Sequence, residues 1–161
     1  MRLTDRCATV VINPLNVTGD FNDTSLGVNM KNYNRCRITL LMTTSGDAAA
    51  TVTLKQGTSA TADTALAYTG YLKNEDLDGN LASWTKVTAS TLTDAGGSAG
   101  DWGYQWEVKA DELDTDTFGS ENTFVRRDVE ATDGNVTAAA LIYDLYEPRD
   151  AKGADGMPSA S

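Results

Sequence analysis

Histidine is absent from this chain of 161 residues, and cysteine and proline are scarce, with two and three copies. Without histidine the chain has neither a Ser–His–Asp triad nor a Cys–His pair, and no histidine-ligated zinc site. No run of 18 apolar residues occurs, so no transmembrane helix is expected. Residues 1–6 are rich in charge and precede only a short apolar stretch, which argues against a secretory signal peptide.

Basic residues are fewer than acidic ones. The chain has 13 Lys and Arg and 23 Asp and Glu, which gives a net charge of −10. A surface of this sign repels phosphates, so nucleic acid is not expected as a partner. A membrane is not expected as a partner either. Small residues are abundant instead, with 22 Thr and 20 Ala, which suit strands and loops. A chain of this length forms one domain whose core folds without disulfides or metals, and no cofactor is expected.

Apolar and polar residues alternate along three segments of the chain. A period of two predicts a half-buried strand of an antiparallel sheet, with one face in the core and the other in water. The three segments are 35–42, 51–56 and 104–109, and their inward residues are Cys36, Ile38, Leu40 and Met42, then Val52 and Leu54, then Tyr104, Trp106 and Val108.

Six further segments are predicted as strands on weaker patterns. Among them, 136–146 is the most apolar, with apolar residues on both faces. Such a strand is either buried on both sides or contacts a partner through its outer face. The six segments are 8–12, 25–30, 65–72, 84–89, 123–130 and 136–146.

Turn residues separate the predicted strands. Asp133-Gly134-Asn135 predicts a hairpin between the last two strands, and Ser45-Gly46-Asp47 is expected to join another pair. Glu147-Pro148-Arg149 is expected to end the last strand. Loops are predicted for residues 13–24, 78–80 and 94–101, and residues 111–114 allow one short helical turn.

Eight or nine such strands predict an all-β fold, an antiparallel β-sandwich. A jelly roll is the favoured version, and an immunoglobulin-like sandwich is the alternative. The sandwich domain is expected to span residues 1–149, including an extended N-terminal segment. Residues 150–161 show no apolar pattern, so they are predicted to form a flexible tail or an arm that orders on a partner.

The two cysteines, Cys7 and Cys36, both fall on predicted strands. Neighbouring strands could bring their sulfurs together as a disulfide, but two small buried side chains are the favoured interpretation. A nucleophilic cysteine would need a base, and no histidine is present to supply one.

Two acidic segments of the sequence have residue types that bind metals or act in catalysis. Residues 74–80 place Asn74, Asp76, Asp78 and Gly79 with the spacing of half an EF-hand loop. The closing ligand of such a loop would fall on Thr85, and the flanks are not helical, so a solvated acidic turn is favoured. The second cluster consists of Asp111, Glu112, Asp114 and Asp116.

A glycosidase requires at least a pair of catalytic carboxylates, but acidic clusters also occur without a function in a chain this acidic. We therefore assign no catalytic, cofactor-binding or metal-ligating residue, and expect no enzyme.

An aromatic sugar platform could be built from Trp84, Trp102, Tyr104 and Trp106. Tyr104 and Trp106 follow the inward alternation, which favours the core, whereas Trp102 lies beside a glycine loop and is expected to be exposed. Sequons at Asn16, Asn22 and Asn135 are expected by chance, and Arg126-Arg127 are expected to form ion pairs or a subunit contact.

Four stretches of the sequence resemble small acidic virion proteins of tailed bacteriophages. They are VNMKNYNR at 28–35, TVTLKQ at 51–56, ALAY at 65–68 followed by KN at 73–74, and LIYDLYEPR at 141–149. The resemblance extends over most of residues 1–149, and its motifs mark turns and strands, so it carries over no functional residue.

The resemblance implies a capsid decoration, or cement, protein with a jelly-roll fold. Such a protein is made in the host cytoplasm, is usually a homotrimer, and binds the major capsid protein on the outside of the phage head. Two alternatives stay open at this point. One is a phage tail, fibre or other carbohydrate-binding module that uses Trp84 or Trp102, and the other is a glycan-degrading enzyme that uses two carboxylates between residues 111 and 116.

Overall fold

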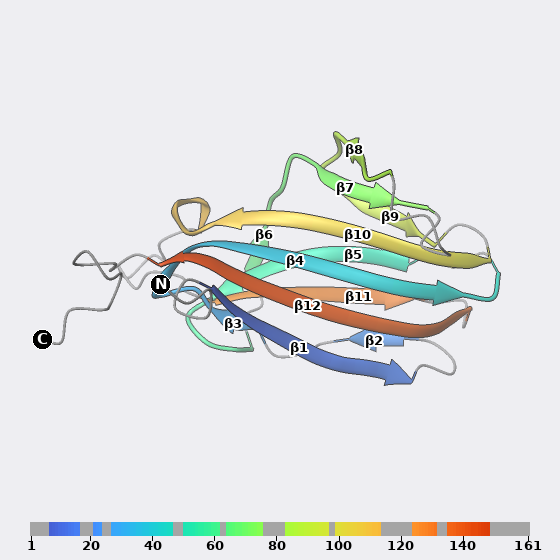
Figure 1. The fold of residues 1–161 in the computed structure, drawn as a ribbon, viewed down its shortest axis with the longest axis horizontal. Coiled ribbons are helices and arrows are strands. Elements are labelled where there is room, and N and C mark those ends of the chain that lie inside the picture. The colour runs from blue at the N-terminus through green and yellow to red at the C-terminus, as the bar shows by residue number, and fades with distance from the viewer. Residues whose placement is uncertain are drawn as a thin grey trace, which may run out of the picture.

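Strands form nearly all of the computed structural model, which describes residues 7–16, 21–23, 27–46, 50–61, 64–75, 83–96, 99–113, 124–131 and 135–148 (Figure 1). The strands are β1 (Cys7–Asn16), β2 (Phe21–Asp23), β3 (Val28–Asn29), β4 (Tyr33–Thr44), β5 (Ala50–Gly57), β6 (Thr64–Leu66), β7 (Tyr71–Asn74), β8 (Thr85–Val87), β9 (Leu92–Ala95), β10 (Gly100–Lys109), β11 (Phe124–Ala131) and β12 (Val136–Pro148). One 3-10 turn, η2 (Ala110–Glu112), follows β10. This described part of the chain has no helix whose length and apolar character would let it span a bilayer.

The strands form two antiparallel sheets that lie one in front of the other (Figure 1). The first sheet has the order β1-β12-β4-β10-β7-β8. The second has the order β2-β11-β5-β6, with β3 also pairing with β11 and β9 with β5. Most connections carry the chain from one sheet to the other, so strands far apart in sequence become neighbours, as in two interlocked Greek keys. The predicted jelly-roll sandwich is therefore confirmed.

The alternation that predicts the strands also fills the core. Along β4 the apolar inward residues are at most 2% exposed, and the inward residues of β5 and β10 are also buried. Burying these apolar side chains between the sheets supplies most of the favourable free energy of folding. The buried residues of these three strands include Cys36, Ile38, Leu40, Met42, Val52, Leu54, Gln56, Trp102, Tyr104, Trp106 and Val108.

An aromatic cluster closes the core near β7. The ring centroids of Tyr71 and Trp106 lie 5.9 Å apart, and those of Tyr104 and Trp106 lie 6.3 Å apart. Tyr68 meets Trp106 edge-on at 6.2 Å. These separations are in the range at which aromatic pairs attract. The cluster fixes the point where the chain passes from the second sheet into the first.

Two predicted strand pairs are wrong. In chain order, the predicted turn at residues 133–135 falls between β11 and β12, and that at residues 45–47 falls between β4 and β5. In both cases the two strands lie in different sheets and do not pair. Turn chemistry reverses the chain direction equally well within a sheet and between sheets, so it could not separate the two cases.

The segment 65–72 is not one strand. It forms the end of β6 and the start of β7, which belong to different sheets, and the chain crosses between them at residues 67–70. At Gly70 a Cβ atom would lie 2.6 Å from the carbonyl oxygen of Val87, so only glycine allows this close approach of two backbones.

Other boundaries also differ from the prediction. β9 was missed because the glycines after it indicated a loop, and β10 begins at Gly100 inside that predicted loop. The predicted loop at 13–24 contains the end of β1 and all of β2. The described residues thus form twelve strands where eight or nine were expected. The predicted tail, residues 150–161, and residues 1–6 lie outside the described residues.

Candidate functional site

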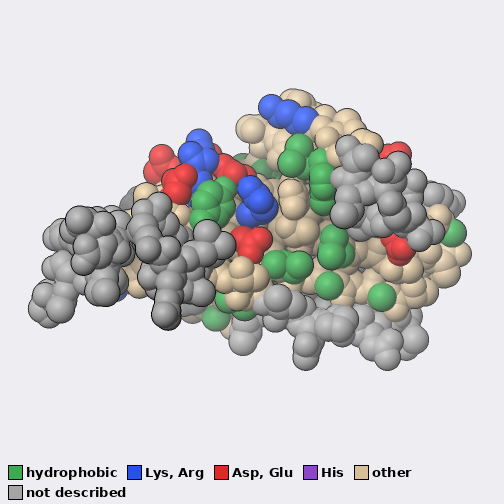
Figure 2. Space-filling model, viewed as in Figure 1, with side chains coloured by type: hydrophobic (Ala, Val, Ile, Leu, Met, Phe, Trp, Pro, Cys, Tyr) green, Lys and Arg blue, Asp and Glu red, His purple; other side chains and the backbone are tan. Residues whose placement is uncertain are grey.

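The candidate functional site lies on the outer face of the first sheet, which is turned away from the second sheet (Figure 2). Hydrophobic side chains occupy its middle, and acidic and basic side chains gather at the end where β4 begins and β12 ends. Outer faces of antiparallel sandwiches are normally polar. The apolar side chains in the middle of this face are therefore unusual, and they make it the candidate functional surface.

We call this middle the apolar patch, and it consists of Leu41, Ala138, Ala140 and Ile142 around Thr39. The cross-strand register places Leu41 beside Ala140 and Gly103, and Ile142 beside Thr39. Ala138 is exposed, whereas Leu41, Ala140 and Ile142 are half-buried. Thr39 lies in the centre and is only 7% exposed, because its larger neighbours cover it.

The short side chains leave a shallow depression on the patch. Its volume is about 260 Å³, and it is lined by Leu41, Thr43, Asp101, Ala138 and Ala140 among others. Gly103 contributes no side chain beside Leu41. A flat, small-residue surface of this kind lets another protein approach the sheet closely, and it offers no deep cavity that would enclose a small molecule.

At the end of the face, Arg35, Arg37, Glu107, Tyr146 and Glu147 form what we call the charged cluster. Arg35 makes ion pairs with Glu107 and, at 3.0 Å, with Glu147. The hydroxyl of Tyr146 donates to Glu107 Oε2 at 2.5 Å, and the guanidinium of Arg37 lies 5.8 Å from the ring centre of Tyr146. Three strands, β4, β10 and β12, contribute to the cluster, which the register brings together on adjacent rungs.

The protonation states of the cluster are set by these contacts. The hydrogen bond from Tyr146, and then Arg35, lower the pKa of Glu107, so its carboxylate stays ionised at neutral pH. Partial burial, and then the neighbouring Glu107, raise the pKa of Tyr146, so its hydroxyl stays protonated. Neither group is poised to exchange a proton near pH 7, which suits recognition of a partner better than acid–base catalysis.

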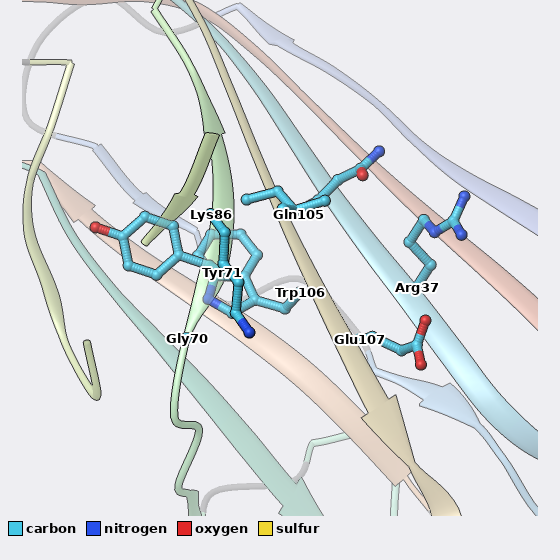
Figure 3. Close-up of a pocket in the computed structure, with 8 residues that line it drawn as sticks. Arg37, Gly70, Tyr71, Lys86, Gln105, Trp106 and Glu107 are labelled. Atoms are coloured by element: carbon cyan, nitrogen blue, oxygen red, sulfur yellow. The ribbon is translucent and has the colours of Figure 1, made fainter. Parts of the chain in front are cut away.

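A second recess, which we call the β10 hollow, lies where β7 separates from β10 (Figure 3). It has a volume of about 230 Å³. Arg37 and Glu107 stand on one side of it and Tyr71 and Lys86 on the other, as Figure 3 shows. The hollow is also lined by Gly70, Leu72, Gln105 and Trp106.

The two cysteines are separated by a strand. Cys7 begins β1 and Cys36 lies in β4, and β12 runs between these strands. Two inter-strand spacings amount to roughly 9–10 Å, beyond the reach of a disulfide. Cys36 is a buried free thiol whose pKa is raised by burial, so it is not a nucleophile. The interpretation of Cys36 as a small buried side chain is confirmed.

The acidic segments do not form a site within the described residues. Asn74 is buried in β7 and does not lie in a solvated loop, and Glu75 pairs with Lys73 at 2.5 Å. Glu112 accepts a hydrogen bond from the Lys109 amide at 3.0 Å and so closes the turn at the end of β10. The other members of the two acidic segments, at 76–80, 114 and 116, lie outside the described residues.

The expected exposed tryptophan is buried. Trp102 is 7% exposed, and its indole Nε1 donates to Thr44 Oγ1 at 3.1 Å, so it belongs to the core. Tyr104 and Trp106 are in the core as predicted, and Trp84 is half-buried beside β8. These positions do not assemble a platform of exposed rings. Asn135 is half-buried just before β12, and the side chains of Asn16, Asn22, Arg126 and Arg127 lie outside the described part.

The alternation of the sequence carries part of the signal for the charged cluster. Arg35 and Arg37 are the outward positions of the clearest alternating segment, and Asp144 and Tyr146 are outward positions of the last strand. Their pairing with Glu107 depends on the order of β10, β4 and β12 in the sheet, which alternation does not reveal.

No protein-family model and no curated protein sequence matches the chain. Among solved structures, the VP2 subviral particle of infectious bursal disease virus is 12% identical with a TM-score of 0.41, over 88% of this chain and 33% of that one. A Bacillus endospore appendage protein is 11% identical with a TM-score of 0.38, over 88% and 87% of the two chains. The SPBc2 prophage-derived protein YomS is 8% identical with a TM-score of 0.36, over 88% and 95%. The chain thus spans about one third of the length of the bursal disease virus protein.

Proposed function

We propose that this protein is a structural component of a phage virion, a capsid decoration or cement protein. It binds the outside of the head, where it stabilises contacts between major capsid proteins. The observation that carries the proposal is the apolar patch on the outer face of the first sheet, where the fold by itself would place polar residues. The sequence resemblance to small acidic virion proteins points to the same role.

The arrangement of the outer face suits a protein partner. Protein interfaces combine an apolar centre with a polar rim, and the apolar patch is bordered by the charged cluster in the same way. Contiguous exposed apolar surface on a soluble protein marks interaction sites. Chemistry is not required of a cement protein, which accords with a chain that has no histidine.

The proposal includes a homotrimer seated at a symmetry axis of the shell. Each copy contributes one weak contact, and several linked copies bind far more firmly than one. The protein would be made in the host cytoplasm and attach to the capsid surface. This attachment needs neither a cofactor nor a metal.

Co-sedimentation with mature capsids tests the proposal. The wild-type protein is expected to pellet with capsids, and Ile142→Asp is expected to lower the bound fraction at least about tenfold, because a charge would be buried in the interface. Thr93→Asp is the matched control, since Thr93 is exposed on β9 in the second sheet. This control is expected to bind like the wild type.

Two results would contradict the proposal. One is the absence of the wild-type protein from the capsid pellet at every concentration tested, and the other is an equal bound fraction for the wild type and Ile142→Asp. The molar mass from light scattering tests the trimer separately. A strictly monomeric protein would remove the trimer from the proposal.

A further inference from the structure

The strand β1 ends the first sheet, and among the described strands it has a neighbour on one side only (Figure 1). It pairs with β12 from Cys7 to Asn16, and no described strand lies beside its other side, which we call the open edge. With ten residues β1 is much longer than β8, the three-residue strand that ends the same sheet opposite to it. A long strand edge is a template for another extended chain.

One rung of the first sheet runs through Lys109, Arg35, Tyr146 and Cys7, which lie on β10, β4, β12 and β1. In an antiparallel pair, a residue turns its N–H and C=O either both toward the partner strand or both away from it. The Lys109 amide is turned away from β4, because it donates to Glu112 Oε2 at 3.0 Å. The backbone groups of Arg35 and Tyr146 therefore point at each other, and those of Cys7 point away from β12 to the open edge.

Every second residue of β1 continues this pattern. Counted on by two, the N–H and C=O of Cys7, Thr9 and Val11 face the open edge, and the residues between them bond to β12. No described backbone group outside the sheet pairs with these three residues. The usable run ends before Pro14, which has no N–H, and the register with β12 also shifts there. The open edge thus offers three consecutive hydrogen-bonding positions.

The charge of the chain favours a second copy at this edge. Residues 7–19 are the longest run of the sequence without a charged side chain. Two copies, each with a net charge of −10, repel each other, so they approach most easily where neither carries a charge. Val10, in the same run, is 40% exposed and is the only large hydrophobic side chain so exposed in the described part of the chain. The charges that usually protect a sheet edge are absent from this strand.

The open edge is also complementary to itself. Two β1 strands related by a two-fold axis run antiparallel, so each meets the same surface on the other. With the axis beside Thr9, Cys7 of one copy lies opposite Val11 of the other, and Thr9 lies opposite Thr9. All of these residues turn an N–H and a C=O to the edge, which allows about six hydrogen bonds between the two strands.

We infer that two copies of this protein associate by antiparallel pairing of their β1 strands, which joins their first sheets into one continuous sheet. This two-fold contact is separate from the proposed trimer contact, so in a trimer it connects one subunit to a subunit of the next trimer. The inference goes beyond the proposed function and does not depend on it, because it concerns only the contact between two copies.

Amide hydrogen exchange, followed residue by residue with nuclear magnetic resonance, tests the inference on the full chain. One strand pair is a small interface, so a dissociation constant on the order of 0.1 mM is expected. Between about 20 µM and about 1 mM protein, exchange at Thr9 and Val11 is expected to slow about fourfold, as paired amides exchange only when the contact opens. Ala8 and Val10 are the internal control, since their amides bond to β12 at both concentrations and their exchange is expected to stay constant.

Two substitutions at one position separate the backbone from the side chain. Thr9→Pro removes an N–H from the open edge and leaves the groups that bond to β12, so it is expected to abolish the slowing at Val11. Thr9→Val is the matched control. It removes the hydroxyl that donates to Asp144 Oδ1 at 2.7 Å but keeps the N–H, so the slowing is expected to remain.

Three results would overturn the inference. The first is exchange at Thr9 and Val11 that does not depend on concentration in the wild type, a result that needs no variant to fold. The second is protection of these amides at every concentration that is lost on removal of residues 150–161, which would assign the edge to the chain's own tail. The third is slowing only after capsids are added, which would assign the edge to a capsid segment.

Discussion

Tyr104 and Trp102 keep their polar atoms hydrogen-bonded although both side chains are buried in the core. The Gly96 amide donates to the Tyr104 hydroxyl at 2.9 Å, and Trp102 Nε1 donates to Thr44. Gly96 has a φ of 76°, which glycine adopts without strain, and this conformation turns its amide toward the tyrosine. A buried donor without an acceptor is costly, so the first bond ties Gly96, just after β9, to the core and the second ties β10 to β4.

Replacing Tyr104 with Phe removes the acceptor of the Gly96 amide and leaves that buried donor unsatisfied. We expect Tyr104→Phe to lower the free energy of unfolding by about 1–3 kcal/mol, measured by urea denaturation. Tyr71→Phe is the matched control, because the half-buried Tyr71 contacts the same aromatic cluster through its ring. A loss of no more than about 0.5 kcal/mol is expected there. Equal losses in the two variants would contradict the role of the hydroxyl.

The ionisation of Tyr104 makes the stability of the fold depend on pH in the alkaline range. Burial raises the pKa of Tyr104 to about 12, above the value of about 10 in an unfolded chain. Between these values the unfolded chain releases the proton while the folded protein keeps it, so stability is fully present below pH 10 and falls as the pH rises toward 12. We expect the urea midpoint to drop over this range, and to drop less steeply in Tyr104→Phe. Identical slopes for the two proteins would contradict the assignment.

The crossing between β6 and β7 is the element on which the β10 hollow depends. The chain leaves the second sheet after Leu66 and enters the first at Tyr71, and Gly70 passes against the backbone of Val87. β7 then pairs with β10 through three residues of that strand, Gly103, Tyr104 and Gln105. The same short connection forms one wall of the β10 hollow through Gly70 and Tyr71.

Gly70→Ala tests how tightly this crossing is packed. The added Cβ would lie 2.6 Å from the Val87 carbonyl oxygen, so one backbone must shift, and we expect a loss of about 1–3 kcal/mol in the free energy of unfolding. Gly46→Ala is the control, since its Cβ would lie 3.5 Å from the Asn135 side chain, an ordinary contact. A control loss as large as that of Gly70→Ala would mean that backbone freedom, and not the close approach, matters.

At the scale of the whole molecule, the core is made by the strands of the two sheets. Residues 150–161 contribute no apolar pattern, so their removal is expected to leave the sandwich folded. The midpoint of thermal unfolding is expected to change by no more than about 2 °C on deletion of these residues, measured by circular dichroism. Loss of the unfolding transition in the shortened chain would show that the tail is part of the fold.

The sequence by itself determined the class of fold and the identity of much of the core. Alternation in 35–42, 51–56 and 104–109 predicted both the strands and their buried faces, because the period of two is a local property of an extended backbone. The apolar residues on both faces of the last strand indicated either burial on both sides or contact with a partner through the outer face. In the structure, the outward residues Ala138, Ala140 and Ile142 of this strand belong to the apolar patch.

Only the tertiary structure decided which strands are neighbours. β11 and β12, which flank the predicted turn at 133–135, lie in different sheets, and Arg35, Glu107 and Tyr146 meet because β4 lies between β10 and β12. Trp102 is in the core because β10 begins earlier than its turn residues indicated. The physical reason is the same in each case. Pairing and burial depend on contacts between segments distant in sequence, which the whole fold satisfies together and no single segment encodes.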